Sequence, residues 1–512
     1  MTVALDRSGA EQTSETPRRE APPDAALHAL AQRLAEVAPV LDAGDAGAPD
    51  PTLPLGARTA ELLLSLVTAV QQSREPARVW LLLVAVGGVL PLDEEVRAAR
   101  RQLELAPPPE GVLWLLDWGA AVAAEHASAT SSLRLVRSGV VVDVDFTARH
   151  DLQTGIQRVV RRLAPRWARD HDIELAVWTE RSGALRVLDD DEEERVLRWQ
   201  RPLHRLPRPR SETTLLVPWE GTVVLPEVPG RDQCARLAAL AEHSGNRVTM
   251  VGYYCIPVVS AELMPAAEPT RFVRYLTVVK HADAVAGISR SAAEEFRGFT
   301  AALPAQGLAG PEVVAVPLAT DAPAPADDVG NAPVVPEVLV VGSHEPRKNH
   351  LAVLHAAEVL WREGHAFRLH LIGGPGWTTT AFDARLEALR RAGRPVEAQR
   401  SVDDDGLWRA YRRARFTVFP SLHEGYGLPV VESLTLGTPV VATSYGSIAE
   451  LAADGGVVPV DPHDDDALTA AMRSLLTDDA RLEALRAEAR ARPLRTWDDY
   501  ARDLWQALVE HR

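Results

Sequence analysis

The stretch FTVFPSLHEGYGLPVVESLTLGTPVVATS (residues 416–444) decides which fold we expect for this chain. FTVFPS and TPVVATS are short apolar runs typical of buried strands, and GLPVVESLTLG between them has the punctuation of a helix. Pro429 suits the first helical position, where its missing N–H costs nothing, and Gly437 suits the residue just after the helix. A strand, a helix and a second strand in this order predict a parallel sheet covered by helices.

The same alternation extends along the chain in both directions. EVLVVGS, FRLHLIGG and the helical segments after them predict a Rossmann-like domain at 337–495, and GVVVDVDF, TTLLVPW, RVTMVGYY and AVAGIS predict another at 139–320. Residues 321–336 (DAPAPADDVGNAPVVP) lack periodicity and are typical of an interdomain linker. Two such domains leave a crevice between the carboxyl ends of their strands, where ligands bind.

Outside these two domains the sequence predicts mostly helix. Residues 1–25 are polar and are expected to form a disordered tail. Residues 26–135 have helical periodicity broken by Pro/Gly stretches, which predicts a small α-helical domain, and 496–512 predict a C-terminal helix. The apolar run VWLLLVAVGGVLPL, starting at Val79, is too short to span a bilayer and is expected to be a buried helix.

Composition excludes several classes of function. A net charge of −16 argues against nucleic acid as the main partner. The two cysteines give neither a disulfide framework nor metal-ligand spacing, and the N-terminus lacks the apolar segment of a signal peptide, so we expect a cytoplasmic protein. Of 55 basic residues only Lys280 and Lys348 are lysines, which draws attention to each of them.

Glu424 and Glu432 bracket the loop and helix start of HEGYGLPVVES. Free N–H groups at a helix start attract phosphate, and carboxylates beside them accept hydrogen bonds from sugar hydroxyls. Together they favour a ligand with both phosphates and hydroxyls. An acidic first turn favoured by the helix dipole would explain Glu432 equally well, but it explains less well Glu424 and the glycines at 425 and 427.

A second strand–loop–helix stretch, VVGSHEPRKNHL, places Arg347 and Lys348 side by side at a helix start. Adjacent cations there suit a diphosphate, although a pair of surface charges is the commoner explanation for two neighbouring basic residues. LIGGPGW (371–377) adds a glycine pair after a strand, which a tight turn explains as well as a ligand does.

Two T/S-x-x-Q/E patterns predict capping boxes in the first Rossmann-like domain. Thr154 with Gln157 would fix a helix start, and Gly155 would let backbone approach the crevice. Ser291 with Glu294 predicts a second box, which is explained as structure alone.

The helix that starts at Gly155 has a basic and an apolar face. Such a helix can dock on an anionic membrane surface, although a solvated face of an arginine-rich protein is at least as good an explanation. QRPLHRLPRPR (200–210) is a second basic stretch. The arginines of the helix are Arg158, Arg161, Arg162, Arg166 and Arg169.

These motifs resemble one known family. HEGYGLPVVE resembles the E-x7-E signature of the retaining glycosyltransferases of family 4, which have the GT-B fold. VGSHEPRKNHL resembles the diphosphate-binding loop of that family, and the likeness continues through Gly446 and Glu450. TGIQRVVR and HADAVAGISRSAAEEF resemble its N-terminal domain more loosely. The resemblance covers roughly 139–505 and implies a GT-B fold, two Rossmann-like domains facing a central crevice; the small α-helical domain that precedes them falls outside it.

The resemblance implies a role for individual residues. Glu424 would lie next to the transferred sugar, Glu432 would bind the ribose hydroxyls, and Lys348 would contact the diphosphate. Gly342 is followed by a serine where many relatives have a basic residue, and Arg347 would supply that charge. Further donor-binding residues would be Gly342, His423, Gly425, Tyr426, Gly427, Leu428, Gly155 and, through its backbone, Val402.

One departure concerns the acceptor side. Many relatives carry a His-Asp pair before an Ile-Pro, with the histidine close to the reacting sugar. The corresponding stretch here is GYYCIPVVSAE, which places Tyr253 and Tyr254 at those positions, with Arg158 on the same side of the crevice. Either the acceptor side differs from that of relatives or activity is reduced.

The resemblance implies a retaining hexosyltransferase that uses a nucleotide diphosphate sugar, with no further cofactor and no metal. EPRKN and HEGYGLP resemble mannosyl- and rhamnosyl-transferring relatives. A saccharide or lipid-linked saccharide at the inner face of a membrane is the expected acceptor, and polysaccharide or glycoconjugate biosynthesis the expected process. The oligomeric state is open.

Three alternatives remain open. A sugar-nucleotide epimerase shares the fold but not the E-x7-E segment. A glycoside phosphorylase would need a lysine for pyridoxal phosphate. A catalytically weak relative could bind nucleotide sugar and scaffold a polysaccharide-assembly complex, with the helical region as interaction module.

Overall fold

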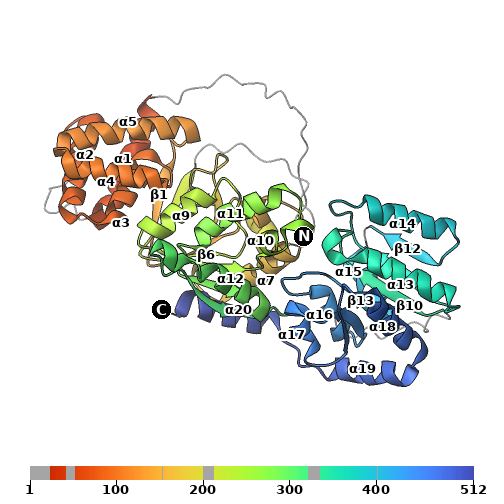
Figure 1. The fold of residues 1–512 in the computed structure, drawn as a ribbon. Helices are drawn as coiled ribbons and strands as arrows, with labels where there is room; N and C mark the ends of the chain where they lie inside the picture. The colour runs from red at the N-terminus through yellow and green to blue at the C-terminus, as the bar shows by residue number, and fades with distance from the viewer. Residues whose placement is uncertain are drawn as a thin grey trace.

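A computed structural model of the chain describes residues 23–41, 52–152, 154–199, 213–320, 335–400 and 402–511. Most of the expected tail (1–25) and linker (321–336) lies outside the described residues, as does the basic stretch at 200–210. Figure 1 shows three regions in a row, with a helical region at one end, a sheet domain in the middle and a second sheet domain at the other end.

Five helices form the helical region. The apolar run that starts at Val79 is helical and buried from Val79 to Gly87 in the third helix, as expected, whereas its last five residues, 88–92, lie beyond the helix end. No helix among the described residues is long and apolar enough to cross a membrane. The helices are α1 (Pro23–Leu41), α2 (Leu55–Ser73), α3 (Pro76–Gly87), α4 (Asp93–Leu105) and α5 (Pro108–His126).

The middle domain is built on a nine-stranded sheet in the order β1-β5-β4-β3-β2-β6-β7-β8-β9. All its pairings are parallel except those of β4. The strand order reverses between β2 and β6, which is a topological switch point of the kind where ligands bind. The strands are β1 (Ser132–Arg137), β2 (Val140–Asp143), β3 (Ile173–Trp178), β4 (Leu185–Val187), β5 (Thr214–Trp219), β6 (Thr222–Leu225), β7 (Arg247–Gly252), β8 (Ala284–Gly287) and β9 (Glu312–Ala315).

Helices cover both faces of this sheet. They are α6 (Asp145–Arg149), α7 (Gly155–Asp170), α8 (Asp190–Leu197), α9 (Cys234–His243), α10 (Ile256–Val259), α11 (Ala267–Val279) and α12 (Arg290–Thr300), with the 3-10 turns η1 (Ala261–Leu263) and η2 (Leu303–Gln306).

The boundary expected near residues 135–139 falls inside the sheet, because β1 is an edge strand and not part of a helix. Helix α1 covers this edge: the Gln32 amide donates to the carbonyl of Leu133 and accepts from its N–H, both at 2.8 Å. Glu36 accepts the N–H of Leu135 at 3.0 Å. An uncovered edge strand is a template for wrong pairing, so the helical region completes the sheet domain. One continuous core runs through both.

The C-terminal domain has a six-stranded, all-parallel sheet in the order β12-β11-β10-β13-β14-β15. Its strand order reverses between β10 and β13. The strands are β10 (Glu337–Val341), β11 (Arg368–Ile372), β12 (Val396–Gln399), β13 (Phe416–Phe419), β14 (Val440–Thr443) and β15 (Val457–Val460). The helices are η3 (Pro346–Lys348), α13 (His350–Arg362), α14 (Thr380–Arg391), α15 (Asp404–Arg413), α16 (Leu428–Thr435), α17 (Gly446–Ala452), α18 (Asp465–Thr477) and α19 (Asp479–Ala491).

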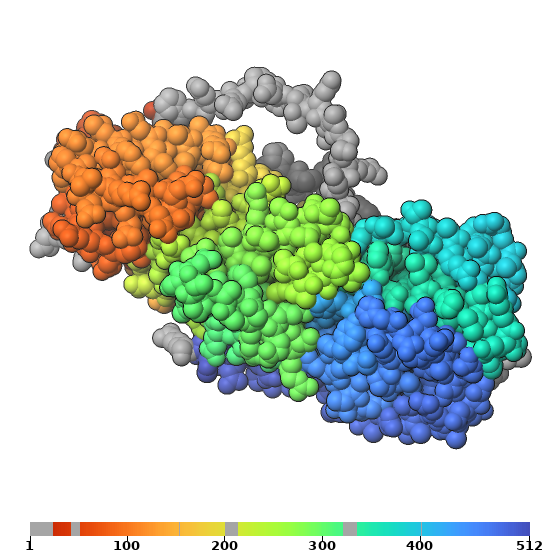
Figure 2. All heavy atoms as spheres, viewed as in Figure 1, coloured from red at the N-terminus to blue at the C-terminus, as the bar shows by residue number. Residues whose placement is uncertain are grey.

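The chain ends on the middle domain, although the residues just before belong to the C-terminal one. Helix α20 (Trp497–Trp505) and the π-helical turn η4 (Gln506–Glu510) pack in one core with α7. The indole N–H of Trp167 donates to the carbonyl of Ala501 at 3.0 Å. In Figure 1 this segment, drawn in blue, lies beneath the green middle domain. The space-filling view shows the middle and C-terminal domains in contact (Figure 2).

Helix α7 corrects two expectations. Thr154 is its N-cap residue but makes no hydrogen bond to a helical N–H; its hydroxyl contacts the Gln157 side chain instead, so no capping box forms. Its apolar residues are buried in the core, so this face is not a membrane-docking surface. Two of its arginines, Arg166 and Arg169, form ion pairs with Asp498.

The second expected capping box, Ser291 with Glu294, does not form. Helix α12 begins at Arg290 and is capped by Ser289, whose hydroxyl accepts the N–H of Ala292 at 2.9 Å. Ser291 is already inside the helix, and its N–H donates to Glu450 of the C-terminal domain at 2.5 Å.

Candidate active site

A cavity of about 530 Å³ lies between the middle and C-terminal domains. The loops after β10 and β13 and the start of α16 form one wall, and α7 with residues 253–254 forms the other. We call it the interdomain cavity. The predicted site residues that line it are Gly155, Arg158, Tyr253, Tyr254, Gly342, Arg347, Lys348, Glu424, Gly425, Tyr426, Gly427, Leu428 and Glu432.

Two loops that meet at the switch point between β10 and β13 bring the predicted cations to Glu424. The N–H of Leu422 donates to the carbonyl of Arg347 at 2.8 Å, which ties the loops together. Lys348 Nζ then lies 2.5 Å from one Glu424 oxygen, and Arg347 lies 2.8 Å from the other. Arg347 also pairs with the buried Glu345 at 2.5 Å. Two cations and two carboxylates thus form one charge-balanced cluster on the cavity wall.

The electrostatics of the cluster favour charged side chains. Burial alone would raise the pKa of Glu424, but Arg347 and Lys348 outweigh it and lower that pKa to about 2. For Lys348, burial is the largest effect and lowers its pKa in spite of the attraction of Glu424. Glu424 and Glu345 outweigh the burial of Arg347 and raise its pKa. Glu424 is therefore an anion at neutral pH, unsuited to donate a proton.

Glu432 occupies a different part of the cavity wall, on the second turn of α16. Its side chain is 4% exposed. Tyr411 of α15 donates its hydroxyl to one oxygen at 2.9 Å, and Arg158 of the opposite domain contacts the other at 2.5 Å. Arg158, expected on the acceptor side, thus lies against the carboxylate expected to bind ribose.

Glycines let the walls approach each other. Gly427, the N-cap of α16, has φ +109°, and a Cβ there would lie 2.4 Å from Ile448. A Cβ on Gly425 would lie 2.4 Å from the carbonyl oxygen of Tyr253, across the domain boundary. Ser289 of the middle domain donates its hydroxyl to the Gly425 carbonyl at 2.7 Å. The glycines of the HEGYG loop therefore allow the two domains to pack closely, in addition to leaving backbone uncovered at the cavity.

The glycine pair of LIGGPGW has a packing explanation. A Cβ on Gly373 would lie 1.9 Å from the carbonyl oxygen of Gly342, which itself has φ +148°. The close approach is therefore between two loops of the protein, and neither Gly373 nor Gly374 lines the interdomain cavity.

His423 and Val402 do not line the cavity. His423 points to the middle domain, with its ring nitrogens 2.8 Å from the Ser260 hydroxyl and 2.7 Å from Glu295. Val402 packs beside Leu407 in the small core behind α15. The side chains of these two residues therefore support the loops around the site and do not line the cavity itself.

The two tyrosines of GYYCIP differ in environment. Tyr253 is buried and donates its hydroxyl to the carbonyl of Pro226 at 2.7 Å, and burial raises its pKa. Its side chain belongs to the core. Tyr254 is half-buried and lines the interdomain cavity. Of the pair, Tyr254 is the side chain with access to a ligand.

Sequence reasoning missed several cavity residues. Tyr411 holds Glu432, and Trp408, Leu407 and Asp404 of α15 line the wall beside it. Their segment was predicted as a helix, but no local motif marked which of its side chains face the crevice.

Among the described residues, one group of side chains could hold a metal ion: Asp93, Glu242 and His243. It lies where α4 meets α9, away from the interdomain cavity. Arg97 pairs with Asp93 at 2.5 Å and with Glu242 at 2.8 Å, so an arginine already neutralises the carboxylates.

The chain matches one family model and is similar to several known proteins. Residues 329–492 match the family model of the glycosyl transferases group 1. The O-antigen chain mannosyltransferase B of Escherichia coli is 36% identical over 143 residues, 28% of this chain and 37% of that protein. The serotype-specific mannosyltransferase WbdA of Escherichia coli is 25% identical over 353 residues, 61% of this chain and 40% of that protein. The chain thus spans less than half the length of these relatives.

A solved structure supports the fold over a larger part of the chain. The trehalose-6-phosphate phosphatase N-terminal domain of Candida albicans has a TM-score of 0.52 at 10% identity, covering 72% of this chain and 95% of that one. Two facing Rossmann-like domains and a preceding helical region confirm the expected GT-B architecture. The match to the family model of the glycosyl transferases group 1, at residues 329–492, falls on the C-terminal domain of this architecture.

Proposed function

We propose that this protein transfers a hexose from a nucleotide diphosphate sugar to a saccharide acceptor with retention of anomeric configuration. The observation that carries the proposal is the arrangement of Glu424, Arg347, Lys348 and Glu432 along one cavity wall. Each carboxylate has its own partners, Arg347 and Lys348 for Glu424 and Arg158 and Tyr411 for Glu432, which does not suit a paired acid and base.

The proposed donor orientation follows from these positions. The diphosphate would lie on Arg347 and Lys348, the transferred sugar against Glu424, and the nucleoside ribose against Glu432. The dipole of α16, whose start lies at the cavity, would add positive potential for the phosphates. Preorganised cations stabilise charge that grows on a leaving diphosphate, which lowers the barrier to departure.

The cluster also constrains the mechanism. Because Glu424 is already bound to both cations, it would act by positioning them and by hydrogen bonding the sugar, rather than as a nucleophile. In the proposed reaction the bond from the anomeric carbon to the leaving phosphate breaks as the acceptor hydroxyl attacks from the same face. The leaving phosphate takes the proton of that hydroxyl, so no side-chain base is needed.

The identity of the transferred sugar and the biosynthetic process are also part of the proposal. The named relatives are mannosyltransferases, one of them of O-antigen chains, and their likeness favours mannose and a polysaccharide or glycoconjugate product. A lipid-linked saccharide is one form that such an acceptor takes.

The first test is thermal unfolding with GDP, UDP, dTDP and their hexose conjugates. A ligand that binds only the folded protein at 100 times its Kd stabilises it by about 2.7 kcal/mol. We expect one nucleotide to raise the Tm and its sugar conjugate to support transfer, with product configuration assigned by proton NMR.

Variants then separate catalysis from binding. We expect Glu424→Gln to reduce transfer at least about 100-fold, whereas the matched control Glu387→Gln, on the exposed face of α14, should leave it unchanged. Nucleotide binding with no turnover of any sugar conjugate would favour a nucleotide-sugar-binding scaffold instead. An inverted product would contradict retention.

A further inference from the structure

His423, the residue just before Glu424, is held by two side chains of the middle domain. Its ring nitrogens lie 2.8 Å from the Ser260 hydroxyl and 2.7 Å from a carboxylate oxygen of Glu295. The side chains of His423 and Glu295 are 16% and 11% exposed, so their contact is largely shielded from water. We call Ser260, Glu295 and His423 the interdomain latch.

The interdomain latch satisfies both ring nitrogens of His423. A neutral imidazole with its proton on Nε2 donates to Glu295 and accepts from the Ser260 hydroxyl, whereas an imidazolium donates to both. The ring cannot rotate without losing these hydrogen bonds, and hydrogen bonds to an ionised group are among the stronger ones in proteins. The latch therefore holds the His423 end of the HEGYG loop against the middle domain.

Glu295 also contacts the segment of the middle domain that lies against this loop. Its second carboxylate oxygen accepts the N–H of Cys255, the residue just before α10. Tyr253, two residues earlier, donates its hydroxyl to the carbonyl of Pro226 at 2.7 Å. The backbone on the middle-domain side of the latch is thus fixed at two points.

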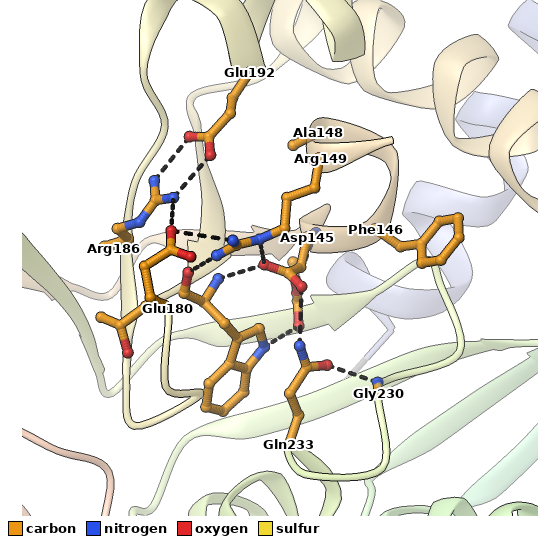
Figure 3. A network of polar contacts seen from close by, with 12 residues as sticks. Asp145, Phe146, Ala148, Arg149, Glu180, Arg186, Glu192, Gly230 and Gln233 are labelled. Carbon is orange, nitrogen blue, oxygen red and sulfur yellow. Dashed lines mark hydrogen bonds and ion pairs between the residues drawn. The ribbon is translucent and has the colours of Figure 1, made fainter. Parts of the chain in front are cut away.

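A polar network keeps residues 226–233 in place (Figure 3). The Gln233 side chain accepts the N–H of Gly230 at 2.7 Å and donates to Asp145 at 3.0 Å. Asp145 also accepts from Arg149 at 2.7 Å. The latch therefore rests on a part of the middle domain that is rigidly held within its own domain.

On the C-terminal side, the interdomain latch connects to Arg347. The carbonyl of His423 accepts from the Arg347 guanidinium at 2.6 Å, and the N–H of Leu422 donates to the Arg347 carbonyl at 2.8 Å. The same guanidinium pairs with Glu424 at 2.8 Å and with Glu345 at 2.5 Å. A rotation of the peptide that follows His423 would therefore move this cation.

A second contact joins the same parts of the two domains. The indole N–H of Trp377 donates to the carbonyl of Leu263, in η1, at 3.1 Å. The loop that carries Trp377 is joined to the loop after β10, because the N–H of His344 donates to the carbonyl of Gly374 at 3.0 Å. Residues 255–263 thus contact the loop after β13 directly and the loop after β10 through Trp377.

We propose that Glu295 and His423 are positioning residues that couple the docking of the two domains to the orientation of Arg347. This rests on the proposed function, in which Arg347 holds the donor diphosphate. When the domains separate, the latch opens and the His423 peptide no longer has a fixed orientation. The cation is then fully preorganised only while the middle domain closes the cavity, which would protect the donor from water.

The first test is amide hydrogen exchange of the full chain without ligand. Glu295→Ala changes a side chain of the middle domain only. We nevertheless expect faster exchange in peptides that cover 343–349 and 420–424 of the C-terminal domain, as well as in 255–263, because the contacts that close these loops are lost. A purely local role of Glu295 would leave the exchange of 343–349 unchanged, and that result would overturn the proposal.

Two further variants of α12 separate the latch from general destabilisation. Glu294→Ala removes the exposed neighbour, which pairs with Arg297 outside the latch, and should exchange like the wild type. In Glu295→Gln the amide can accept the N–H of Cys255 and donate to Nε2 of His423, so we expect it to restore slow exchange. Melting curves verify that each variant folds. Equal exchange in Glu294→Ala and Glu295→Ala would contradict a specific role for the latch.

Kinetics with the donor identified by thermal unfolding then test the effect on catalysis. We expect Glu295→Ala and His423→Ala to lower kcat about 10- to 100-fold with little change in the donor KM, because a displacement of about 1 Å can cost about 100-fold in rate. The double variant should lose little more than either single variant, since both remove the same link. His355→Ala, exposed on α13, is the matched control.

The two proposals fail on different observations. The proposed function fails if no nucleotide or nucleotide sugar raises the Tm, whatever hydrogen exchange shows. The latch proposal fails if Glu295→Ala leaves the exchange of 343–349 unchanged, whether or not a donor binds. It also fails if the two single variants raise KM at unchanged kcat, or if their losses multiply in the double variant.

Discussion

Glu424 shows at the scale of one residue how burial and charge combine. Its carboxylate is buried, which by itself favours the neutral form, yet two cations at 2.5 and 2.8 Å reverse the effect. The same contacts keep Arg347 and Lys348 in place before any donor arrives. The cluster is therefore organised before any ligand binds, and in the proposed function the phosphates of the donor would compete with Glu424 for its cations.

The low pKa of Glu424 predicts how stability depends on pH. Its folded-state pKa of about 2 lies below the ordinary 4.5, so its contribution is complete above about pH 4.5 and disappears as pH falls toward 2. The difference in unfolding free energy between wild type and Glu424→Gln should be constant from pH 5 to 7 and shrink below pH 4.5. Urea titrations across this range measure it. A difference that changes between pH 5 and 7 would mean that another group sets the dependence.

At the scale of elements, the loop between β13 and α16 is a joint between domains as well as a ligand wall. Ser289 bonds to Gly425, and the Tyr426 hydroxyl donates to the carbonyl of Leu318 at 2.6 Å. The position of this loop therefore depends on how the two domains are docked.

Gly425→Ala tests this joint. Its Cβ would meet the Tyr253 carbonyl oxygen at 2.4 Å, so the domains must separate slightly to accommodate it. A displacement of about 1 Å in an active site can cost about 100-fold in rate, and we expect a transfer loss of that order with nucleotide binding retained. Gly298→Ala, which has open space around it, is the matched control. Equal rates for the two variants would show that close approach at Gly425 is not needed.

Helix α20 is a second element that acts in a different domain from the one it follows in the sequence. It follows the C-terminal domain but completes the core of the middle domain, beside α7. Its start is fixed by a capping box between Thr496 and Asp499. The chain therefore passes between the two domains twice. It leaves the middle domain through residues 321–334, which lie outside the described part, and returns to it through residues 492–496.

Leu504→Ala tests this packing, because Leu504 is fully buried on α20. Such a truncation destabilises a protein by about 2–5 kcal/mol, and denaturant unfolding should show a loss in this range. Arg502→Ala, on the exposed side of the same helix, should change stability by less than about 0.5 kcal/mol. Similar values for the two would mean that α20 contributes little to the core.

At the scale of the whole molecule, polar contacts hold the two Rossmann-like domains against each other. Glu450 of the C-terminal domain accepts the N–H groups of Arg290 and Ser291 at the start of α12, at 3.0 and 2.5 Å. Arg158 reaches across the interdomain cavity to Glu432. If Glu432 binds ribose, as proposed, the donor must displace Arg158, so the arginine competes with the donor.

Arg158→Ala tests this competition. We expect the variant to melt at a lower temperature without ligand and to bind the donor about tenfold more tightly, a gain of about 1.4 kcal/mol. Arg166→Ala is the matched control: it lies on the same helix, is equally exposed and pairs with Asp498 outside the cavity. Titration calorimetry measures the affinities. Weaker donor binding by Arg158→Ala would show that Arg158 holds the donor instead.

The sequence by itself determined the alternation of strands and helices and the position of the chemistry-bearing loops. Strand periodicity, Pro429 at a helix start and Gly437 after its end act over a few residues, so local pattern is enough to place β13, the HEGYG loop and α16. Parallel strands bring their loops to one edge, and for this reason Glu424 and Lys348 could be predicted as neighbours although 76 residues separate them.

Only the tertiary structure decided which groups meet across elements. Arg158 against Glu432, 274 positions away, depends on how two domains dock, and no local pattern encodes docking. The same holds for Tyr411 on Glu432, for α1 along the edge of β1, and for α20 on the middle domain. These contacts arise because buried charges need partners and apolar faces need cover, and any compatible surface can supply them.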